Sequence, residues 1–462
     1  MRHSDIHADV SEPVEVSQEK GLRHQLSAGE MAMVAVGGSI GTGLLLGSAA
    51  AIELAGPAVI ISFVLAAFIS WIVSLALGEL ASAHPAAGAF GLYGELYLNQ
   101  WAGFLSRTGY WAAISISVGA EMVASATYMA YWFPRVPAFS WIVVFSLLLL
   151  LINLRSVHDY GRFEFWFAMV KVVTIAAFVV LGGALLLMGR VAPQYTNHGG
   201  FFPKGTLAPL LAMTFAIYTF GGVEFVAVTS GESRSPKDVA RASQLTFVML
   251  TLVYLGAIAV LVGVVPWNRT GVGESPFVTV FRSVEIPRAG GLMNFVVLTA
   301  ALSGANAALY ISSRMLFSMA RSGWAPPWLG HLNREGSPNR ALLASSYGIV
   351  AAFLLEKWAP MDAFVYILRG AFFGLILSWV VSLAAHVCFR RKLTGEELAR
   401  LPMRSPLGAW GSIVGFVLVC AAVVRTWWDS RVNLVSSLVY LLLCTLAFLL
   451  LRSKRNQSTM ST

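Results

Sequence analysis

The stretch that decides the fold lies in the first long apolar segment and reads Gly37-Gly38-Ser39-Ile40-Gly41-Thr42-Gly43. Four of these seven residues are glycine, a density hard to reconcile with a continuous membrane helix. An interrupted helix leaves backbone N–H and C=O groups unpaired in lipid, so interruptions occur where the backbone lines a cavity. The stretch therefore predicts a membrane helix that is broken near its middle.

The composition outside this stretch indicates a membrane protein. The chain is 57% hydrophobic and only 12% charged, whereas soluble domains carry about 25% charged residues. A chain with so few charges would expose apolar surface to water unless lipid covered it. Because a membrane helix needs about 20 apolar residues, we predict twelve membrane spans, at residues 29–55, 58–83, 101–132, 138–154, 165–189, 208–231, 243–266, 290–319, 341–358, 361–389, 408–426 and 433–451.

The net charge of +9 is spread over short Lys and Arg clusters between the apolar segments, which excludes a nucleic-acid-binding face. With twelve spans both termini lie on one side, and 20 basic residues fall on that side against 9 on the other. Cytoplasmic loops are enriched in Lys and Arg. We therefore expect a multi-pass protein of the cytoplasmic membrane with both termini in the cytoplasm.

The polar residues 1–27 lack the features of a signal peptide, and we expect them to form a disordered cytoplasmic tail. The loop around residues 84–100 has no Lys or Arg and, with the adjoining Trp101, contains the aromatic residues Phe90, Tyr93 and Tyr97, which predicts an amphipathic segment at the membrane interface. The three cysteines lie in apolar segments and form neither a metal motif nor a complete disulfide framework. We interpret them as small lipid-facing or core residues.

A second glycine-rich stretch lies in the sixth span and reads Phe220-Gly221-Gly222-Val223-Glu224. The first and sixth spans are five apart, so they occupy equivalent places in two successive five-helix halves. Interrupted helices at matching positions indicate a transporter site at the interface of two repeats. We expect one repeat at 28–200, its inverted counterpart at 201–392, two further helices at 393–451 and a cytoplasmic tail at 452–462.

Two such interruptions form a receptor for an α-amino acid. The N-terminus of a half-helix presents free N–H groups and a partial positive charge, which suits a carboxylate, and unwound carbonyls suit an ammonium group. The alternative interpretation of the first stretch is a helix-packing face of small residues. A phosphate-binding loop is excluded because no Lys-Ser/Thr pair follows.

Many ordered motifs between Gly21 and Arg391 resemble those of one family. They are Gly21-Leu22-Arg23, Gly38-Ser39-Ile40-Gly41-Thr42-Gly43, Ala55-Gly56-Pro57, Gly78-Glu79-Leu80, Gly161-Arg162-Phe163-Glu164-Phe165-Trp166-Phe167-Ala168, His198-Gly199-Gly200-Phe201-Phe202-Pro203, Phe220-Gly221-Gly222-Val223-Glu224, Gly231-Glu232-Ser233, Leu298-Thr299-Ala300-Ala301-Leu302-Ser303 and Ser313-Arg314-Met315-Leu316. The sequence resembles the bacterial amino acid permeases of the amino acid–polyamine–organocation superfamily, amino acid transporter group.

The resemblance implies an all-α membrane protein with twelve transmembrane helices. Ten would form a LeuT-like inverted repeat of five plus five, with helices one and six discontinuous and two helices peripheral. It also implies a rocking, alternating-access cycle. Ser39, Ile40, Gly41, Thr42 and Gly43 would then hold the substrate carboxylate. Carbonyls near Tyr218, Phe220 and Gly221 would hold the ammonium group, with Tyr218 or Phe220 as an aromatic gate.

Ionisable residues at membrane depth are functional candidates because their insertion costs roughly 2.5–3.5 kcal/mol. Four qualify: Glu121, Lys171, Glu224 and Arg369. The resemblance implies that the Lys171 ammonium stands where sodium-coupled relatives bind sodium, which suggests proton coupling. The alternative is a structural cation that ties spans one, five and eight together.

The remaining candidates each have a structural alternative. Glu224 has either a role in coupling or conformational change or a purely structural one. Glu121 either contacts the substrate or a proton, or forms a hydrogen bond to a neighbouring helix. Arg369 either pairs with one of these acids or faces the cavity, where it would favour an acidic substrate. Ser303 and Asn306 either line the pocket or bond between helices, and Glu232 belongs to a possible inner gate.

These features predict a permease that imports an amino acid by proton symport. An exchanger of the same fold is the main alternative, and a non-transporting amino acid sensor is a further one. No HExxH motif or comparable catalytic constellation occurs in the spans, so we do not expect an enzyme. Nothing in the sequence calls for a cofactor or metal, and the substrate side chain and oligomeric state stay open.

Overall fold

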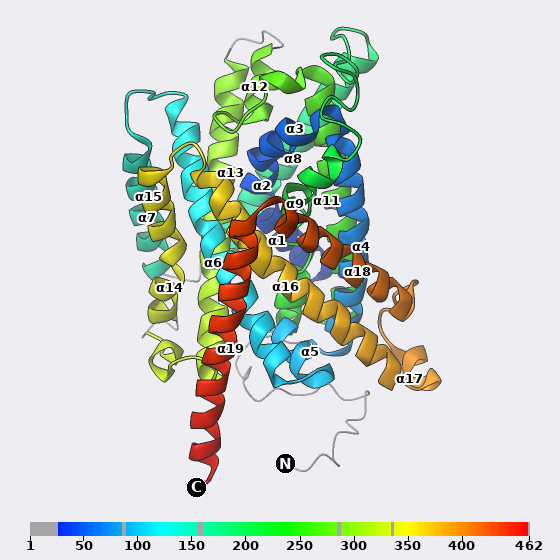
Figure 1. The fold of residues 1–462 in the computed structure, drawn as a ribbon, viewed down its shortest axis with the longest axis vertical. Helices are drawn as coiled ribbons and strands as arrows, with labels where there is room; N and C mark the ends of the chain where they lie inside the picture. Colours follow the sequence, from blue (N-terminus) through cyan, green and yellow to red (C-terminus); the bar gives the residue numbers. More distant parts are fainter. Residues whose placement is uncertain (1–25, 86–88, 156–159, 284–287, 334–336, 461–462) are drawn as a thin grey trace.

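The computed structural model describes residues 26–85, 89–155, 160–283, 288–333 and 337–460, and the expected N-terminal tail lies almost wholly outside these ranges. All secondary-structure elements in the described ranges are helices (Figure 1), apart from one isolated β-bridge between Leu26 and Ser233. The prediction of an all-α protein is confirmed.

The α-helices, in chain order, are α1 (Ala28–Ser39), α2 (Thr42–Leu45), α3 (Gly47–Ala55), α4 (Val59–Ala83), α5 (Ala89–Tyr97), α6 (Gln100–Ala130), α7 (Ala138–Arg155), α8 (Tyr160–Leu187), α9 (Ala208–Thr219), α10 (Phe225–Thr229), α11 (Pro236–Val264), α12 (Pro276–Ser283), α13 (Ala289–Arg321), α14 (Asn339–Ser345), α15 (Tyr347–Trp358), α16 (Ala363–Lys392), α17 (Gly395–Arg400), α18 (Gly408–Asp429) and α19 (Arg431–Met460). The short 3-10 helices are η1 (Gly56–Ala58), η2 (Ser230–Glu232), η3 (Trp267–Arg269) and η4 (Pro327–Gly330).

Nine helices of the described residues are long and apolar enough to cross a membrane, and two shorter apolar helices run over Ala138–Leu154 and Ala208–Thr219. Large apolar side chains such as Leu181, Leu252 and Leu443 are more than half exposed on the outside of the bundle. Such an exterior requires lipid around it. The predicted membrane class is therefore confirmed.

Helix starts follow local capping chemistry. Ser27 accepts a hydrogen bond from the backbone N–H of Glu30, and the Glu30 carboxylate accepts one from the Ser27 backbone, which together form a capping box before α1. At α11 the Ser235 hydroxyl accepts from the backbone N–H of Asp238, and Pro236 occupies the first helical position.

Helix α6 packs against α5, α7, α13, α15 and α16. Glycines permit two of these approaches. A Cβ atom on Gly374 would overlap with the Gly109 carbonyl oxygen, and a Cβ atom on Gly348 would overlap with that of Ser115. Small residues at crossing points let membrane helices pack backbone to backbone, so α6 lies close to both α15 and α16.

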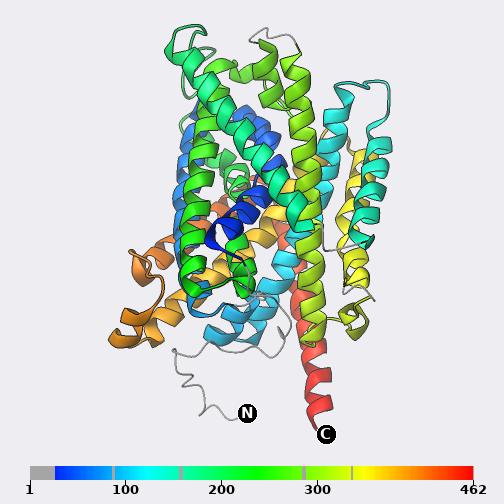
Figure 2. The ribbon, with the colours of Figure 1, turned by 180° about the vertical axis from the view of Figure 1, so that it is seen from behind.

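The segment predicted at the membrane interface forms α5 and packs partly into the bundle. Phe90 and Tyr93 on α5 are 1% and 0% exposed, because α5 packs against α6 and α16. Of the four aromatic residues named there, Trp101 is the one classed as exposed, with 39% of its surface accessible. Figures 1 and 2 show α5 near the end of the bundle from which the C-terminal end of α19 projects.

A buried ion-pair cluster fastens the same end of the bundle. The Glu79 carboxylate on α4 accepts hydrogen bonds from Arg390 on α16, with Nη2 to Oε2 at 2.6 Å, and from the backbone N–H of Ser405, also at 2.6 Å. His386 Nε2 lies 3.4 Å from the same carboxylate. Because Glu79 is fully buried, the cluster fixes α4, α16 and the segment before α18 relative to one another.

The three cysteines agree with the sequence interpretation. Cys388, Cys420 and Cys444 are free and partly exposed on apolar helices.

Candidate functional site

The first interruption lies at the predicted glycines. Helix α1 ends at Ser39, Ile40 and Gly41 are non-helical, and α2 begins at Thr42. Gly41 is extended, with φ −134° and ψ −156°. A Cβ atom at Gly41 would stand 2.5 Å from Oε1 of Glu121, so glycine is required for the close approach of this side chain.

Carbonyls released by this interruption are paired by side chains from other helices. Lys171 Nζ on α8 donates to the Gly37 carbonyl at 2.8 Å. The Tyr254 hydroxyl on α11 donates to the Ser39 carbonyl at 3.0 Å, and the Thr219 hydroxyl on α9 donates to the Gly43 carbonyl at 3.0 Å. Buried backbone groups without partners are costly. Three neighbouring helices therefore stabilise the broken conformation.

The second interruption lies directly against the first. Helix α9 ends at Thr219, residues 220–224 form turns, and α10 begins at Phe225. Gly222 has φ +113°, a conformation that side chains disfavour, and a Cβ atom there would overlap with the Ser39 hydroxyl. The ring of Phe225 packs on Gly38. At both positions a glycine backbone of one interrupted helix thus lies against a side chain of the other.

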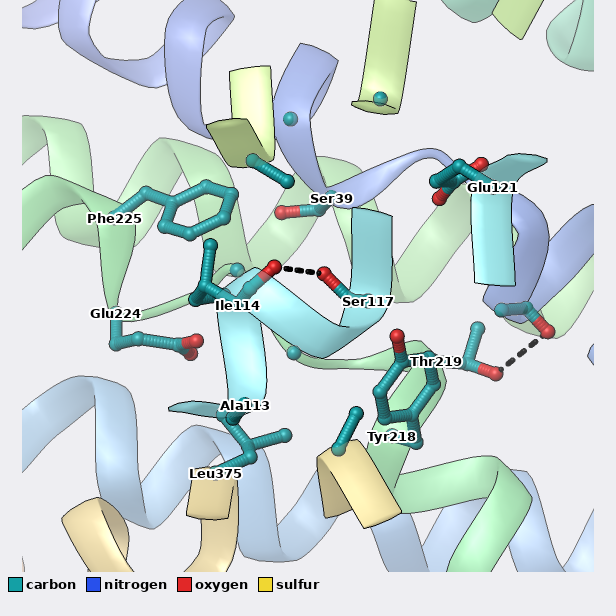
Figure 3. Close-up of a pocket in the computed structure, with 18 residues that line it drawn as sticks. Ser39, Ala113, Ile114, Ser117, Glu121, Tyr218, Thr219, Glu224, Phe225 and Leu375 are labelled. Atoms are coloured by element: carbon teal, nitrogen blue, oxygen red, sulfur yellow. Dashed lines mark hydrogen bonds between the residues drawn. The ribbon is translucent and has the colours of Figure 1, made fainter. Parts of the chain in front are cut away.

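A cavity of about 60 Å³ lies between the two interruptions and is completed by α6, α13 and α16 (Figure 3). Its lining consists of Gly38, Ser39, Gly41, Gly43, Ala113, Ile114, Ser117, Glu121, Tyr218, Thr219, Gly221, Gly222, Glu224, Phe225, Gly304, Ala308, Ala371 and Leu375.

The charged side chains of this lining are both carboxylates, and Figure 3 shows them on opposite sides of the cavity. Glu121 Oε1 accepts from the backbone N–H of Thr42 at 3.2 Å. Glu224 is fully buried and accepts from the Tyr110 hydroxyl at 3.2 Å and from Trp379 Nε1 at 3.4 Å. The lining contains no Lys, Arg or His side chain, so an anionic side chain of a ligand would meet no cation there.

Seven residues named from the sequence line this cavity: Ser39, Gly41, Gly43, Glu121, Tyr218, Gly221 and Glu224. Ile40 and Thr42 are fully buried beside it. Phe220 is also outside the lining, because its ring packs at 74° against Tyr254 with 5.1 Å between centroids. Of the two proposed gate aromatics, only Tyr218 therefore faces the cavity.

The two polar candidates of α13 face elsewhere. Gly304 and Ala308 line the cavity, and the helical repeat turns Ser303 and Asn306 away from that face. Asn306 Oδ1 accepts from Asn153 Nδ2 on α7 at 2.6 Å, which is the interhelical bond considered as its alternative role. Ser303 is buried, with 5% of its surface accessible.

Arg369 also lies outside the cavity. Ala371 and Leu375 form the cavity face of α16, and two residues of helix place Arg369 on another side, where it is partly exposed. No ion pair joins it to Glu121 or Glu224 among the described residues. Both geometries considered for Arg369, pairing with an acid and facing the cavity, are therefore absent from this conformation.

Lys171 and Glu232 lie near the interruptions without lining the cavity. Lys171 is 2% exposed, and its side chain links α8 to α1 through the hydrogen bond to the Gly37 carbonyl. Glu232 is in η2, where its backbone carbonyl accepts from the N–H of Leu26 at 3.0 Å. This hydrogen bond joins Leu26, just before α1, to Glu232, just after α10.

Sequence reasoning missed most of the α6 face and the donors to the freed carbonyls. Ala113, Ser117 and Glu121 follow one another at four-residue spacing on α6. Small residues at that spacing before a buried acid were a usable signal for the cavity face. Tyr254 and Thr219 carried no such signal, because their roles depend on contacts with distant residues.

No three His, Cys, Asp or Glu side chains gather closely enough to hold a metal ion in the part of the chain that the structure describes. The cavity therefore offers backbone dipoles, hydroxyl groups and two carboxylates to a small polar ligand.

A family model described as amino acid permease matches residues 30–456. The chain is 34% identical over 436 residues to the "Uncharacterized amino acid permease YtnA" of Bacillus subtilis, covering 92% of this chain and 94% of that protein. It is 34% identical over 413 residues to the "Aromatic amino acid transport protein AroP" of Escherichia coli K12, covering 88% and 90%. It is 31% identical over 453 residues to the "Probable threonine/serine transporter YbxG" of Bacillus subtilis, covering 96% and 98%.

Proposed function

The chain belongs to the amino acid permease family, and from this premise we propose that it imports a neutral amino acid across the cytoplasmic membrane by proton symport. It is a non-enzymatic membrane transporter. The proposed topology has twelve spans, both termini in the cytoplasm, and inverted repeats at 28–200 and 201–392. Substrate would reach the cavity alternately from each side as the repeats rock.

The observation that carries this proposal is the cavity between two interrupted helices. The backbone N–H groups around Gly41, Thr42 and Gly43 at the start of α2 suit the substrate carboxylate. In this conformation the N–H of Thr42 donates to Glu121 and that of Gly41 donates to the Ser39 carbonyl. Ser39 and Ile40 would shape this end of the site. The ammonium group would lie toward the carbonyls of Tyr218, Phe220 and Gly221, with Tyr218 closing over it.

Lys171 is the proposed site of proton coupling. Its ammonium group donates to the freed Gly37 carbonyl, so loss of its proton would remove the charge from a hydrogen bond that stabilises the first interruption and weaken that bond. Glu224 is a second candidate, because it follows the other interruption directly and is held by Tyr110 and Trp379. Glu232 would take part in closing the inner end.

The proposed substrate is a neutral amino acid for two reasons. Two of the relatives are named for aromatic amino acids and for threonine and serine. The lining of the cavity holds two carboxylates and no cation, which disfavours an acidic side chain. The earlier idea that Arg369 selects an acidic substrate has no support from the lining.

The test is uptake into proteoliposomes of labelled phenylalanine, tyrosine, tryptophan, threonine, serine, lysine and glutamate. We expect accumulation of at least one neutral amino acid when the exterior is more acidic than the interior, independent of sodium. Uptake only into vesicles preloaded with amino acid would identify an exchanger instead. Uptake driven by sodium and indifferent to pH would contradict the role of Lys171.

A further inference from the structure

The carboxylate of Glu121 occupies the place that the proposed function gives to the substrate carboxylate. Its Oε1 accepts from the backbone N–H of Thr42 at 3.2 Å, although 79 residues separate the two in sequence. Its other oxygen, Oε2, is buried without a hydrogen-bond partner. Glu121 as a whole is 8% exposed and lines the cavity.

The chain provides space for this carboxylate on two sides. A Cβ atom at Gly41 would stand 2.5 Å from Oε1, and a Cβ atom at Gly304 would stand 3.1 Å from the carboxyl carbon. Glycines on both α13 and the first interruption thus allow the Glu121 side chain to reach Thr42. The space between Gly41 and Gly304 therefore accommodates a carboxylate group, and the Oε2 atom of Glu121 is buried there without a hydrogen-bond partner.

We propose that Glu121 is a resident carboxylate that holds Thr42 in the empty site and must leave it before an amino acid can bind. The inference rests on the proposed function, since it concerns the same site. One N–H group cannot serve two carboxylates at this distance, and two like charges in a buried site repel each other. The substrate carboxylate therefore competes with Glu121 for the same donor.

When an internal group occupies the site, the apparent affinity for the substrate equals the intrinsic affinity multiplied by the fraction of molecules in which the site is free. If Glu121 occupies Thr42 in about 90% of molecules, its removal raises affinity about tenfold. The alternative role for Glu121 is direct attraction of the substrate ammonium group. In that case removal of the carboxylate would lower affinity, so the two roles predict opposite signs.

Matched pairs of ligands separate the two roles further. Phenethylamine is phenylalanine without its carboxylate, and 1-aminopropan-2-ol is threonine without its carboxylate. An amine has no group that competes for the Thr42 N–H, so displacement of Glu121 gives it no advantage. Only the amino acid of each pair gains from removal of the resident carboxylate.

The experiment measures dissociation constants of labelled phenylalanine and threonine, and competition by the two amines, for the purified full-length protein. The variants are Glu121→Ala and the nearly isosteric Glu121→Gln, with Glu53→Gln as the control because Glu53 is an exposed acid on α3. We expect both Glu121 variants to bind the transported amino acid more tightly, by about tenfold for Glu121→Ala, without tighter amine binding. The gain should be smaller for Glu121→Gln, whose amide oxygen still accepts from the Thr42 N–H although its charge is gone. Glu53→Gln should change neither.

Weaker amino acid binding by both Glu121 variants would overturn the inference, and so would an equal gain for amino acid and amine. If only Glu121→Ala fails to fold, the sign of the change in Glu121→Gln decides. A wild-type protein that takes up none of the neutral amino acids in the uptake panel would instead refute the proposed function, which is a separate result.

Discussion

Ser39 and Gly222 face each other where the two interrupted helices meet, and a Cβ atom on Gly222 would overlap with the Ser39 hydroxyl. Gly222 also has φ +113°. At this pair the backbone of one interrupted helix lies against a side chain of the other. Its geometry depends on the absence of a side chain at one position.

Replacement of Gly222 by alanine should abolish transport and destabilise the protein. The positive φ alone costs about 1–3 kcal/mol for a residue with a side chain, and the clash with Ser39 adds to it. Gly183→Ala in α8 is the matched control, because a Cβ atom there meets no neighbouring atom within 4 Å. Uptake in proteoliposomes and melting temperature check both, and normal transport by Gly222→Ala would count against direct contact of the interruptions.

Tyr254→Phe should weaken transport while the protein stays folded. The variant keeps the ring that packs on Phe220 and loses only the hydroxyl that donates to the Ser39 carbonyl, a bond with a net contribution of about 0.5–1.5 kcal/mol. We expect a raised KM. Tyr195→Phe removes a similar bond, to the Ala259 carbonyl, away from the cavity, and its KM should match the wild type.

Lys171→Met should uncouple uptake from the proton gradient. The substitution keeps a flexible, unbranched side chain that is one atom shorter, and it removes the charged donor to the Gly37 carbonyl. Since hydrogen bonds to charged groups contribute about 1.5–3 kcal/mol, gradient-driven accumulation should fall by roughly tenfold or more. Lys204→Met, on an exposed loop, serves as the control. Accumulation by Lys171→Met that still follows the pH gradient would remove Lys171 from the coupling mechanism.

Glu79→Ala should destabilise the protein by about 3–5 kcal/mol, because it leaves the Arg390 guanidinium, whose side chain is only 11% exposed, without its carboxylate partner. Glu274→Ala breaks an ion pair with the more exposed Arg282, so its effect should stay within about 1 kcal/mol. Thermal unfolding in detergent compares the two. Equal effects would show that the Glu79 cluster contributes little to folding.

Stability should decrease as the pH falls below about 6.5, partly because of His84. Burial lowers the pKa of this histidine, which follows α4 and pairs with the Tyr97 hydroxyl at 2.5 Å. The unfolded state therefore binds a proton at a higher pH than the folded state, and unfolding is favoured in acid. His84→Gln should reduce the loss of melting temperature between pH 7.5 and 5.5, and an unchanged loss would assign the effect to other groups.

Local chemistry explains why several features could be read without a structure. Apolar length predicts membrane helices one at a time, and the glycines at 37–43 and 221–222 predict interruptions because each disfavours a helix wherever the chain goes. Glu121 and Glu224 were found because a buried charge is costly at any membrane depth. None of these inferences needs to know which helices are neighbours.

Other features depend on helix rotation, which the sequence expresses weakly. Ser303, Asn306 and Arg369 were reasonable polar candidates, yet Gly304, Ala308, Ala371 and Leu375 form the cavity faces of their helices. An error of one residue turns a side chain by about 100°, which is enough to move it from the cavity to a neighbouring helix. The burial of Phe90 and Tyr93 likewise depends on tertiary packing, because α5 packs against α6 and α16.

By itself, the sequence determined that this is an apolar, all-helical membrane protein with two interrupted helices and buried carboxylates, because those properties belong to single residues and short segments. Only the tertiary structure decided that Tyr254, Thr219 and Lys171 pair with the freed carbonyls and that Glu121 reaches Thr42. These contacts join residues far apart in the chain, and they exist only once helix packing brings a donor within hydrogen-bond distance of its acceptor.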